Sequence, residues 1–332
     1  MKKLIQLGLG FSCIILFSAC GNGQASKSKE KKDKITFVLD WTPNTNHTGL
    51  YVAKEKGYYD DLGLDVEIIQ PSEDSASMLV ASGKAAFGIS AQDSLAANYA
   101  AKEPLPITTV AAILQHNTSG IMSRKDEGLE QPKGLEGTTY ATWDSPVEQA
   151  MIKNVMEKDG GDFSKVKLIP NNIVDESLAL KEKQADSIWV FYGWGGVSAE
   201  IQQVPTDFFY FKDLNPVFDY YTPVIIANND FLVKNTDVAK RFLQATKKGY
   251  EETIVSPEEA AKILLKAAPE LDETLVNASQ KWLSDQYQAQ STNWGVIDPN
   301  RWNAFYNWLS ENQLVENTIP ENTGFTNDYL VE

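Results

Sequence analysis

Cysteine and histidine are scarce in this sequence. Its 332 residues include two cysteines and two histidines, and one of the cysteines, Cys13, lies in an apolar run at the amino terminus. If that run is removed, Cys20 is the single thiol left, which excludes a disulfide or a thiolate metal site in the folded part. His47 and His116 are far apart in the sequence, so carboxylates are the remaining candidates for metal ligands. We therefore expect no bound metal.

Basic residues are outnumbered by acidic ones. The chain has 30 Lys and Arg against 45 Asp and Glu, which gives a formal net charge of −15 at pH 7. Because phosphate binding requires a positive surface, nucleic acid is not an expected partner. The arginines, Arg124, Arg241 and Arg301, lie outside the loops that we single out below.

Nucleotide-binding and hydrolase motifs are missing. The sequence has no Walker loop, no Gly-x-Gly-x-x-Gly after a strand and no His-Glu-x-x-His. It also lacks the Gly-x-Ser-x-Gly elbow that would place a serine nucleophile for His47 or His116. A Ser-His-acid hydrolase is therefore disfavoured. Hydrophobic residues make up 42% of the chain, which is ample for a packed core.

The amino terminus has the pattern of an exported lipoprotein. Two lysines precede the apolar run Leu4 to Phe17, which is too short to span a bilayer, and small residues follow. The residues Phe17-Ser18-Ala19-Cys20 resemble a bacterial lipobox. We expect a signal peptide at 1–19, an acylated Cys20, and a disordered polar tether up to Lys34. The protein would then be anchored by lipid on the outer face of the cytoplasmic membrane.

Strands and helices alternate along the rest of the chain. The alternation runs over residues 35–124 and again over 125–224, which predicts two lobes, each with a mostly parallel sheet covered by helices. The apolar strand Tyr221 to Asn228 would return the chain to the first lobe, which residues 225–332 complete with helices. Aromatic residues at helical spacing in this last part are expected in the core. They are Trp282, Trp302, Phe305, Tyr306 and Trp308.

Polar and aromatic residues gather in the loops that follow the predicted strands. The clearest case is Asp40 to Gly49, after the strand Ile35 to Leu39. Loops at the carboxyl ends of parallel strands converge on a crevice where small ligands bind. Aromatic faces with amides and acids, and without basic side chains, suit a flat, neutral or weakly basic heterocycle. The candidate ligand-binding residues are Asp40, Trp41, Asn46, His47, Ser90, Gln92, Trp143, Ser145, Glu148, Tyr192, Trp194 and Asp219.

Three stretches carry a family resemblance. The run Ile35 to Gly49, with Ala53 to Tyr59 and Gly63 to Val66, resembles the pyrimidine-precursor family of periplasmic-binding-protein-like proteins, and the likeness extends to about Tyr329. The resemblance implies the type II two-lobed α/β fold with two hinge strands. It also implies a monomeric binding protein without a cofactor. Such a protein would capture a thiamine pyrimidine precursor for the permease and ATPase of an ABC importer.

The same family includes enzymes that build the thiamine pyrimidine from their own histidine and a lysine-bound pyridoxal phosphate. Where they carry that lysine and histidine, this chain has Ser90-Ala91-Gln92-Asp93-Ser94. It has Trp143-Asp144-Ser145-Pro146 in place of their phosphate cradle, and Asp219-Tyr220-Tyr221-Thr222-Pro223 in place of their cysteine-rich iron motif. We therefore expect a binder and not an enzyme. An enzyme using the same cleft and a binder of a sulfonate, nitrate or amino acid are the alternatives.

An acid is expected to pair with the aminopyrimidine. Such a ring offers a nitrogen acceptor beside an amine donor, and a carboxyl group can engage both. Asp40, Glu148 and Asp219 are candidates because each stands at or just beyond a predicted strand end. Two alternatives stay open: Glu148 as a first-turn acid that interacts with the helix dipole, and Asp40 as a loop cap.

Overall fold

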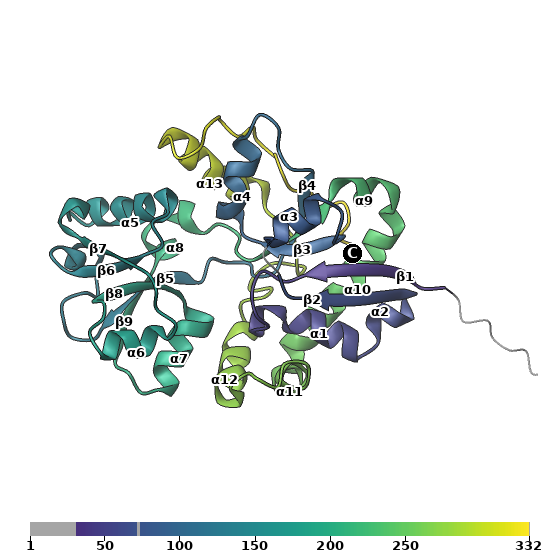
Figure 1. Ribbon diagram of the computed structural model, residues 1–332, viewed down its shortest axis with the longest axis horizontal. Coiled ribbons are helices and arrows are strands. Elements are labelled where there is room, and N and C mark those ends of the chain that lie inside the picture. Colours follow the sequence, from purple (N-terminus) through teal and green to yellow (C-terminus); the bar gives the residue numbers. More distant parts are fainter. Residues whose placement is uncertain (1–30, 72–73, 332) are drawn as a thin grey trace, which may run out of the picture. The chain divides into compact units, whose positions relative to one another are not determined.

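The computed structural model describes residues 31–71 and 74–331. The predicted signal peptide, Cys20 and most of the tether lie outside these described residues. The chain divides into two units, and Lys32–Glu332, the larger, is described here by itself (Figure 1). No helix among the described residues has both the length and the apolar character needed to cross a membrane.

The first lobe is built on a five-stranded sheet with the order β2-β1-β3-β10-β4. Strand β1 runs parallel to β2 and β3, whereas β10 runs antiparallel to its neighbours β3 and β4. Both faces are covered by helices, so the strands are apolar over most of their length. The bounds are β1 (Asp33–Val38), β2 (Leu64–Ile69), β3 (Phe87–Ser90), β4 (Ile107–Ala112) and β10 (Val224–Asn228).

The helices of this lobe come from both ends of the described chain. Helices α3, α4 and α13 lie above the sheet in Figure 1, and α1, α11 and α12 lie below it. The helical stretch after the first strand is interrupted, because Gly57 adopts a φ of 77° between α1 and α2. The bounds are α1 (Thr48–Glu55), α2 (Tyr58–Asp61), α3 (Ala76–Ala81), α4 (Gln92–Ala100), α9 (Asn229–Lys234), α10 (Thr236–Val255), α11 (Pro257–Ala267), α12 (Glu273–Ser284) and α13 (Pro299–Glu311).

Helices α1 and α10 approach each other closely at two glycines. A Cβ on Gly49 would lie 2.3 Å from the ring of Tyr250, and one on Gly249 would lie 2.1 Å from the Gly49 carbonyl oxygen. Only glycine fits at such a contact. The Tyr250 hydroxyl also donates to the carbonyl of Asn46 at 2.7 Å. Helix α10 therefore holds the start of α1, and with it the preceding loop.

The second lobe has its own five-stranded sheet, with the order β7-β6-β8-β5-β9. Strand β6 is parallel to β7 and β8, and β5 is antiparallel to β8 and β9. The strands are β5 (Ser119–Arg124), β6 (Thr139–Thr142), β7 (Lys167–Pro170), β8 (Ser187–Phe191) and β9 (Thr206–Tyr210). The main helices are α5 (Pro146–Lys158), α6 (Glu176–Lys181), α7 (Val197–Ile201) and α8 (Phe211–Leu214).

The chain passes between the lobes twice. The first crossing segment is 113–118, between β4 and β5, and the second is 219–223, between the 3-10 helix η5 (Pro216–Phe218) and β10. The two-lobed α/β architecture expected from the sequence is confirmed. The predicted boundary at residue 124 is wrong, because β5 pairs with β8 and β9 in the second sheet. Sheet membership depends on long-range pairing, which the local sequence of β5 does not reveal.

Most of the C-terminal aromatics lie in the core, as expected. Trp302, Phe305, Tyr306 and Trp308 are buried in a cluster that also contains residues of the second crossing segment and of α5. Trp282 is the exception. It is only partly buried, and its ring centroid lies 5.3 Å from that of Tyr192 in the second lobe.

Candidate functional site

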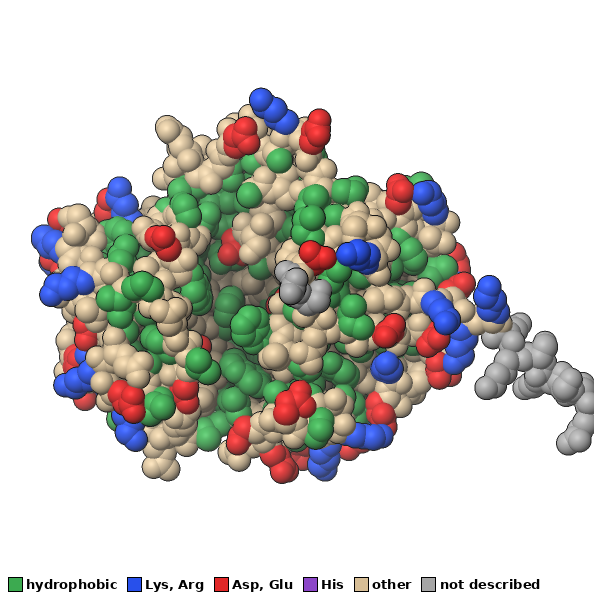
Figure 2. Space-filling view, in the orientation of Figure 1, with side chains coloured by type: hydrophobic (Ala, Val, Ile, Leu, Met, Phe, Trp, Pro, Cys, Tyr) green, Lys and Arg blue, Asp and Glu red, His purple; other side chains and the backbone are tan. Residues whose placement is uncertain are grey.

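The carboxyl ends of strands from both sheets meet beside the crossing segments. Phe191, at the end of β8, pairs with Ser119, which directly follows the first crossing segment. Ser90, at the end of β3, pairs with Val224, which directly follows the second. The two crossing segments also contact each other through Asn117 and Asp219. Figure 2 shows a hollow between the lobes with mainly hydrophobic visible walls, and Lys and Arg on the outer surfaces.

The loop after β1 is held by a buried histidine. Asn44 caps the 3-10 helix η1 (Thr45–His47), and its backbone N–H donates to His47 Nδ1 at 3.2 Å. His47 Nε2 therefore carries the proton and donates to Asp40 Oδ1 at 2.8 Å. The Asp40 side chain is 39% exposed, and its Oδ2 has no hydrogen-bond partner in the described part of the chain. His47 thus orients a carboxylate that has one oxygen available. Asn46 lies half-buried in the same short helix.

Two tryptophans stand exposed at the site, one from each lobe. Trp41 follows β1 and is 69% exposed, and Trp143 follows β6 and is 52% exposed. The Trp143 ring lies 5.9 Å, centroid to centroid, from the buried ring of Trp189. A large apolar side chain exposed in a loop needs a reason, and a ligand that stacks on it supplies one.

Glu148 holds the Trp143 loop in place through hydrogen bonds to its carboxylate. It is buried in the first turn of α5, and its carboxylate accepts hydrogen bonds from the Tyr140 hydroxyl at 2.5 Å and the Thr142 hydroxyl at 2.9 Å. It also accepts from the backbone N–H groups of Trp143 and Ser145. Ser145 caps the same helix by accepting from the Glu148 backbone N–H. Both oxygens of Glu148 are engaged by the protein, which favours the helix-start alternative over a direct ligand contact.

Gln92 joins three elements at the end of β3. Its Nε2 donates to the Trp302 carbonyl and its Oε1 accepts from the Tyr221 backbone N–H, both at 2.9 Å. The side chain is fully buried and links α4 to the second crossing segment and α13. Its neighbour Ser90 accepts a hydrogen bond from Ser77 at 3.3 Å and is partly exposed. Of these two predicted contacts, Ser90 is the one with accessible surface.

The glycine-rich segment after β8 forms one π-helical turn, η4 (Tyr192–Gly196), and not the open loop expected from the sequence. The Tyr192 hydroxyl donates to Glu200, and its ring lies beside Phe208 and Trp282. Burial and the Glu200 carboxylate raise the pKa of Tyr192 to about 12. Trp194 packs against buried residues of α11 and α12. The turn therefore presents its aromatic rings mainly to α12 and its neighbours.

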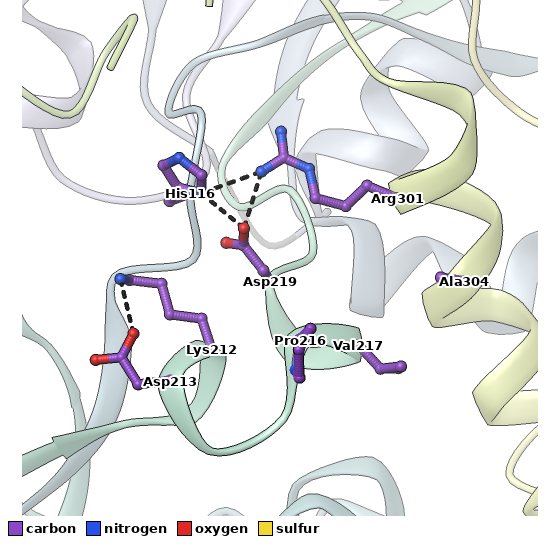
Figure 3. Close-up of a pocket in the computed structure, with 8 residues that line it drawn as sticks. All are labelled: His116, Lys212, Asp213, Pro216, Val217, Asp219, Arg301 and Ala304. Atoms are coloured by element: carbon purple, nitrogen blue, oxygen red, sulfur yellow. Dashed lines mark hydrogen bonds and ion pairs between the residues drawn. The ribbon is translucent and has the colours of Figure 1, made fainter. Parts of the chain in front are cut away.

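Asp219 lies in a charged cluster that joins the crossing segments (Figure 3). Its carboxylate accepts from His116 Nδ1 at 2.6 Å, the Asn117 backbone N–H at 2.9 Å and Arg301 Nη1 at 3.0 Å. Arg301 comes from the first turn of α13, so the expectation that it lies away from the strand-end regions is wrong. The cluster lines a cavity of about 470 Å³ that α8 and η5 complete.

These contacts shift the pKa values of His116 and Asp219. The hydrogen bond to Asp219 raises the pKa of His116 above its ordinary value, against the effects of burial and of Arg301. Burial raises the pKa of the Asp219 carboxyl, but the His116 hydrogen bond and the charges of His116 and Arg301 outweigh it, and the net pKa is lowered. Asp219 therefore acts as an ionised link between the crossings, with its oxygens already occupied.

Three side chains that sequence reasoning missed lie near the site. Phe191, at the end of β8, is 38% exposed. Trp189 Nε1 and Asp93 Oδ1 are buried polar atoms without a hydrogen-bond partner among the described residues. Burial raises the pKa of Asp93. Asp93 stands in the Ser90–Ser94 loop, but an acid in a first helical turn has an ordinary structural explanation, so the pattern did not distinguish it. Residues 31–71 and 74–331 contain no group of three or more metal-ligating side chains.

Comparison with known proteins places this site in a family. A profile described as NMT1/THI5 like matches residues 44–260, which is more than half of the chain and includes η1, β3 and η4. The chain belongs to the NMT1/THI5-like family. Its membership agrees with the resemblance seen in the opening strand and loop.

Relatives of this NMT1/THI5-like chain include both a protein named as a binder and proteins named as enzymes. The formylaminopyrimidine-binding protein of Halalkalibacterium halodurans is 28% identical over 334 residues, covering 98% of each chain. The 4-amino-5-hydroxymethyl-2-methylpyrimidine phosphate synthase THI11 of Saccharomyces cerevisiae is 27% identical over 266 residues, covering 73% of this chain and 74% of the yeast protein.

Solved structures share the fold at low identity. The periplasmic aliphatic sulphonate binding protein SsuA of Escherichia coli has a TM-score of 0.69 at 13% identity, covering 90% of this chain and 94% of its own. The CA3427 gene product of Candida albicans, whose fold is described as the generic periplasmic binding protein fold, has a TM-score of 0.63 at 16% identity. The periplasmic-binding-protein fold is thereby confirmed.

Proposed function

We propose that this protein is the substrate-binding component of an ABC importer and captures a thiamine pyrimidine precursor, N-formyl-4-amino-5-aminomethyl-2-methylpyrimidine. The observation that carries the proposal is the composition of the strand-end loops. They offer exposed Trp41 and Trp143 from opposite lobes and an acid with a free oxygen, Asp40. The loops that follow β1, β3, β6 and β8 contain no Lys or Arg. The full-length likeness to a formylaminopyrimidine-binding protein supports the same ligand.

The chemistry of recognition follows from these groups. An aminopyrimidine ring is flat and can stack on an indole face, which contributes about 1–3 kcal/mol per face by analogy with nucleobases. Its amine, or a protonated ring nitrogen beside that amine, donates to a carboxylate oxygen that the protein leaves available. Asp40 is the acid that we assign to this role, because Glu148 and Asp219 already have their oxygens occupied.

Membrane anchoring belongs to the same proposal. Export with acylation at Cys20 would hold the binder beside its permease, and a diacylglyceryl group provides the two chains that stable anchoring requires. The support is the sequence of the amino terminus, where an apolar run ends in small residues and Cys20.

A pyrimidine synthase is the alternative that the yeast relative raises. The segment Ser90-Ala91-Gln92-Asp93-Ser94 has neither the lysine nor the histidine that the resemblance implies for those enzymes. A sulfonate binder is the alternative that the solved structures raise, but at 13% identity they share the fold alone. A sulfonate also favours basic groups or helix N-termini, whereas these loops are acidic and aromatic.

Mass spectrometry of the small molecule released on denaturing the purified protein tests the proposal directly. Calorimetry then compares the formylated pyrimidine, the free amine, the alcohol and an alkanesulfonate. We expect the pyrimidines to bind, to be recovered unchanged, and to resist competition by the sulfonate. Conversion of the pyrimidine would indicate an enzyme, and preferential binding of the sulfonate would reject the pyrimidine assignment.

A further inference from the structure

A second contact between the lobes lies away from the crossing segments, where helix α12 of the first lobe meets the turn η4 and helix α7 of the second (Figure 1). The turn leaves little space there. A Cβ on Gly193 would lie 3.0 Å from Leu283 and 3.1 Å from Trp282, both on α12. The neighbouring Trp194 packs on Ala261, Leu264 and Val276 of α11 and α12. The turn η4 therefore packs against helices of the opposite lobe.

Two buried hydroxyl groups connect this contact to the ligand-binding loop. The Ser279 hydroxyl, on α12, donates to the Gly193 carbonyl, and it lies 2.6 Å from the hydroxyl of Thr45. Because the Ser279 proton points to Gly193, the Thr45 hydroxyl must donate to Ser279. Ser279 is 0% exposed and Thr45 is 1% exposed, so no water replaces either bond while the lobes are in contact.

The hydrogen bonds from Gly193 through Ser279 lead to Thr45, which lies in the loop that we assign to ligand binding. Thr45 is the first residue of η1, and the last residue of that short helix, His47, orients Asp40. The Thr45 carbonyl is held independently by the Tyr287 hydroxyl at 2.5 Å, and Gln280 donates to that hydroxyl at 3.0 Å. Thr45 is thus fixed to the first lobe through its carbonyl, and its hydroxyl donates to Ser279, the α12 residue that bonds to Gly193 of the second lobe.

We propose that Ser279 is a positioning residue that couples the Asp40–His47 loop to closure of the second lobe through the chain Thr45, Ser279 and Gly193. Opening the contact breaks the hydrogen bond between the Ser279 hydroxyl and the Gly193 carbonyl. It also removes Trp194 from its packing against Ala261, Leu264 and Val276. A ligand that fixes the Asp40 loop therefore favours the closed contact, and the closed contact favours the ligand. The identity of that ligand rests on the proposed function, whereas the coupling between the lobes does not.

The coupling can be measured without any ligand. Cys13→Ser and Cys20→Ser remove both native thiols from the full chain, so spin labels attach only at introduced cysteines. Val174→Cys in the second lobe and Val255→Cys in the first provide label sites that are 97% and 78% exposed. In this background we expect Ser279→Ala to lengthen or broaden the distance between the labels. Ser284→Ala is the matched control, because among the described residues that hydroxyl bonds only to the Lys281 carbonyl in its own helix. Equal distances in the Ser279→Ala and Ser284→Ala proteins would overturn the proposal.

Affinity for the formylaminopyrimidine provides the second readout. Loss of one buried hydrogen bond from the chain Thr45, Ser279 and Gly193 should weaken binding by about fivefold to tenfold. Thr45→Val should show this loss and Thr45→Ser should not, because only the latter keeps the hydroxyl. Gly193→Ala should resemble Ser279→Ala, because its methyl group pushes against Leu283 and Trp282. Equal affinities for Thr45→Val and Thr45→Ser would overturn the coupling. If the unmodified protein fails to bind the pyrimidine, the proposed function fails, and the label distances still test the contact.

Discussion

His116 Nδ1 lies 2.6 Å from Asp219 Oδ2, and this pair joins the first crossing segment to the second. The other ring nitrogen, Nε2, lies 2.9 Å from Gln290 Oε1. Each nitrogen thus faces an acceptor, which favours the doubly protonated ring, although Arg301 lies close by and opposes its charge. The lobes are therefore linked by an interaction that depends on pH.

Because the pKa of His116 is raised in the folded protein, its contribution to stability is fully present below its unfolded pKa and is lost as pH rises through the folded pKa. The lowered pKa of Asp219 means that its contribution is lost as pH falls through the folded pKa. We expect His116→Asn to cost about 1–3 kcal/mol of unfolding free energy near pH 6 and less near pH 9. Urea unfolding at the two pH values measures this, with exposed Asp230→Asn as the control. A loss that does not change with pH would contradict the assignment.

Trp41→Ala and Trp143→Ala should each weaken binding of the formylaminopyrimidine by about tenfold or more, if each indole covers one face of the ring. Their melting temperatures should change little, because both side chains are largely exposed. Calorimetry and thermal unfolding separate the two effects. Val233→Ala, at a residue 77% exposed on α9, is a control that should alter neither. Full affinity in both tryptophan variants would place the ligand elsewhere.

Asp40→Asn should remove the charge and leave the loop intact. Asparagine keeps an oxygen that accepts from His47 Nε2, so we expect an unchanged melting temperature. Affinity for the pyrimidine should fall by about 1–3 kcal/mol, because a ligand donor loses its charged partner. The comparison variant is Asp144→Asn, an exposed acid in the loop of the other lobe. If the two variants bind equally well, Asp40 is not the recognition acid.

Glu148→Ala should act on stability first. Its removal leaves the buried hydroxyls of Tyr140 and Thr142 without their acceptor, which costs about 1–3 kcal/mol for each group left unpaired. The melting temperature should therefore fall, whereas Glu157→Ala, an exposed change on the same helix, should shift the unfolding free energy by less than about 0.5 kcal/mol. Lost affinity without lost stability in Glu148→Ala would instead make this acid a direct ligand contact.

Cys20→Ala should release the protein from the membrane into the medium. The change removes the acylation site that we propose, and one remaining polybasic segment, Lys27 to Lys34, gives only weak attraction to lipid headgroups. Fractionation followed by immunodetection measures the release. Cys13→Ala, within the segment expected to be cleaved, should have no effect. A Cys20→Ala protein that stays in the membrane fraction would contradict the lipobox assignment.

The fold was predictable from the sequence because its signals are local. An apolar strand followed by a polar loop and a helix start is visible at Val38 to Leu50, and the structure has β1, η1 and α1 there. The sheet to which a strand belongs was not predictable from local signals. The residues of β5, Ser-Gly-Ile-Met-Ser-Arg, suit a buried strand of either sheet, and only its pairing with β8 and β9 assigns it to the second lobe.

The site was less predictable because its side chains are engaged by partners distant in sequence. Nothing near Gln92 indicates that its amide bonds to Trp302 and Tyr221. Likewise, Arg301 reaches Asp219 across 82 positions. Sequence spacing identifies which residues stand at strand ends. It does not show whether their polar atoms are already satisfied, and that distinguishes Asp40 from Glu148.

The position of β10 has a consequence for the growing polypeptide. The second lobe is one continuous stretch from β5 to η5, whereas the first lobe needs β10, which lies between β3 and the edge strand β4. During synthesis the second lobe is complete before Val224 has been made, while β3 and β4 still lack the strand that joins them. The lobe that begins first is therefore finished last. A chain that stops before Val224 leaves β3 and β4 without the strand that joins them, and their exposed edges favour association with other chains.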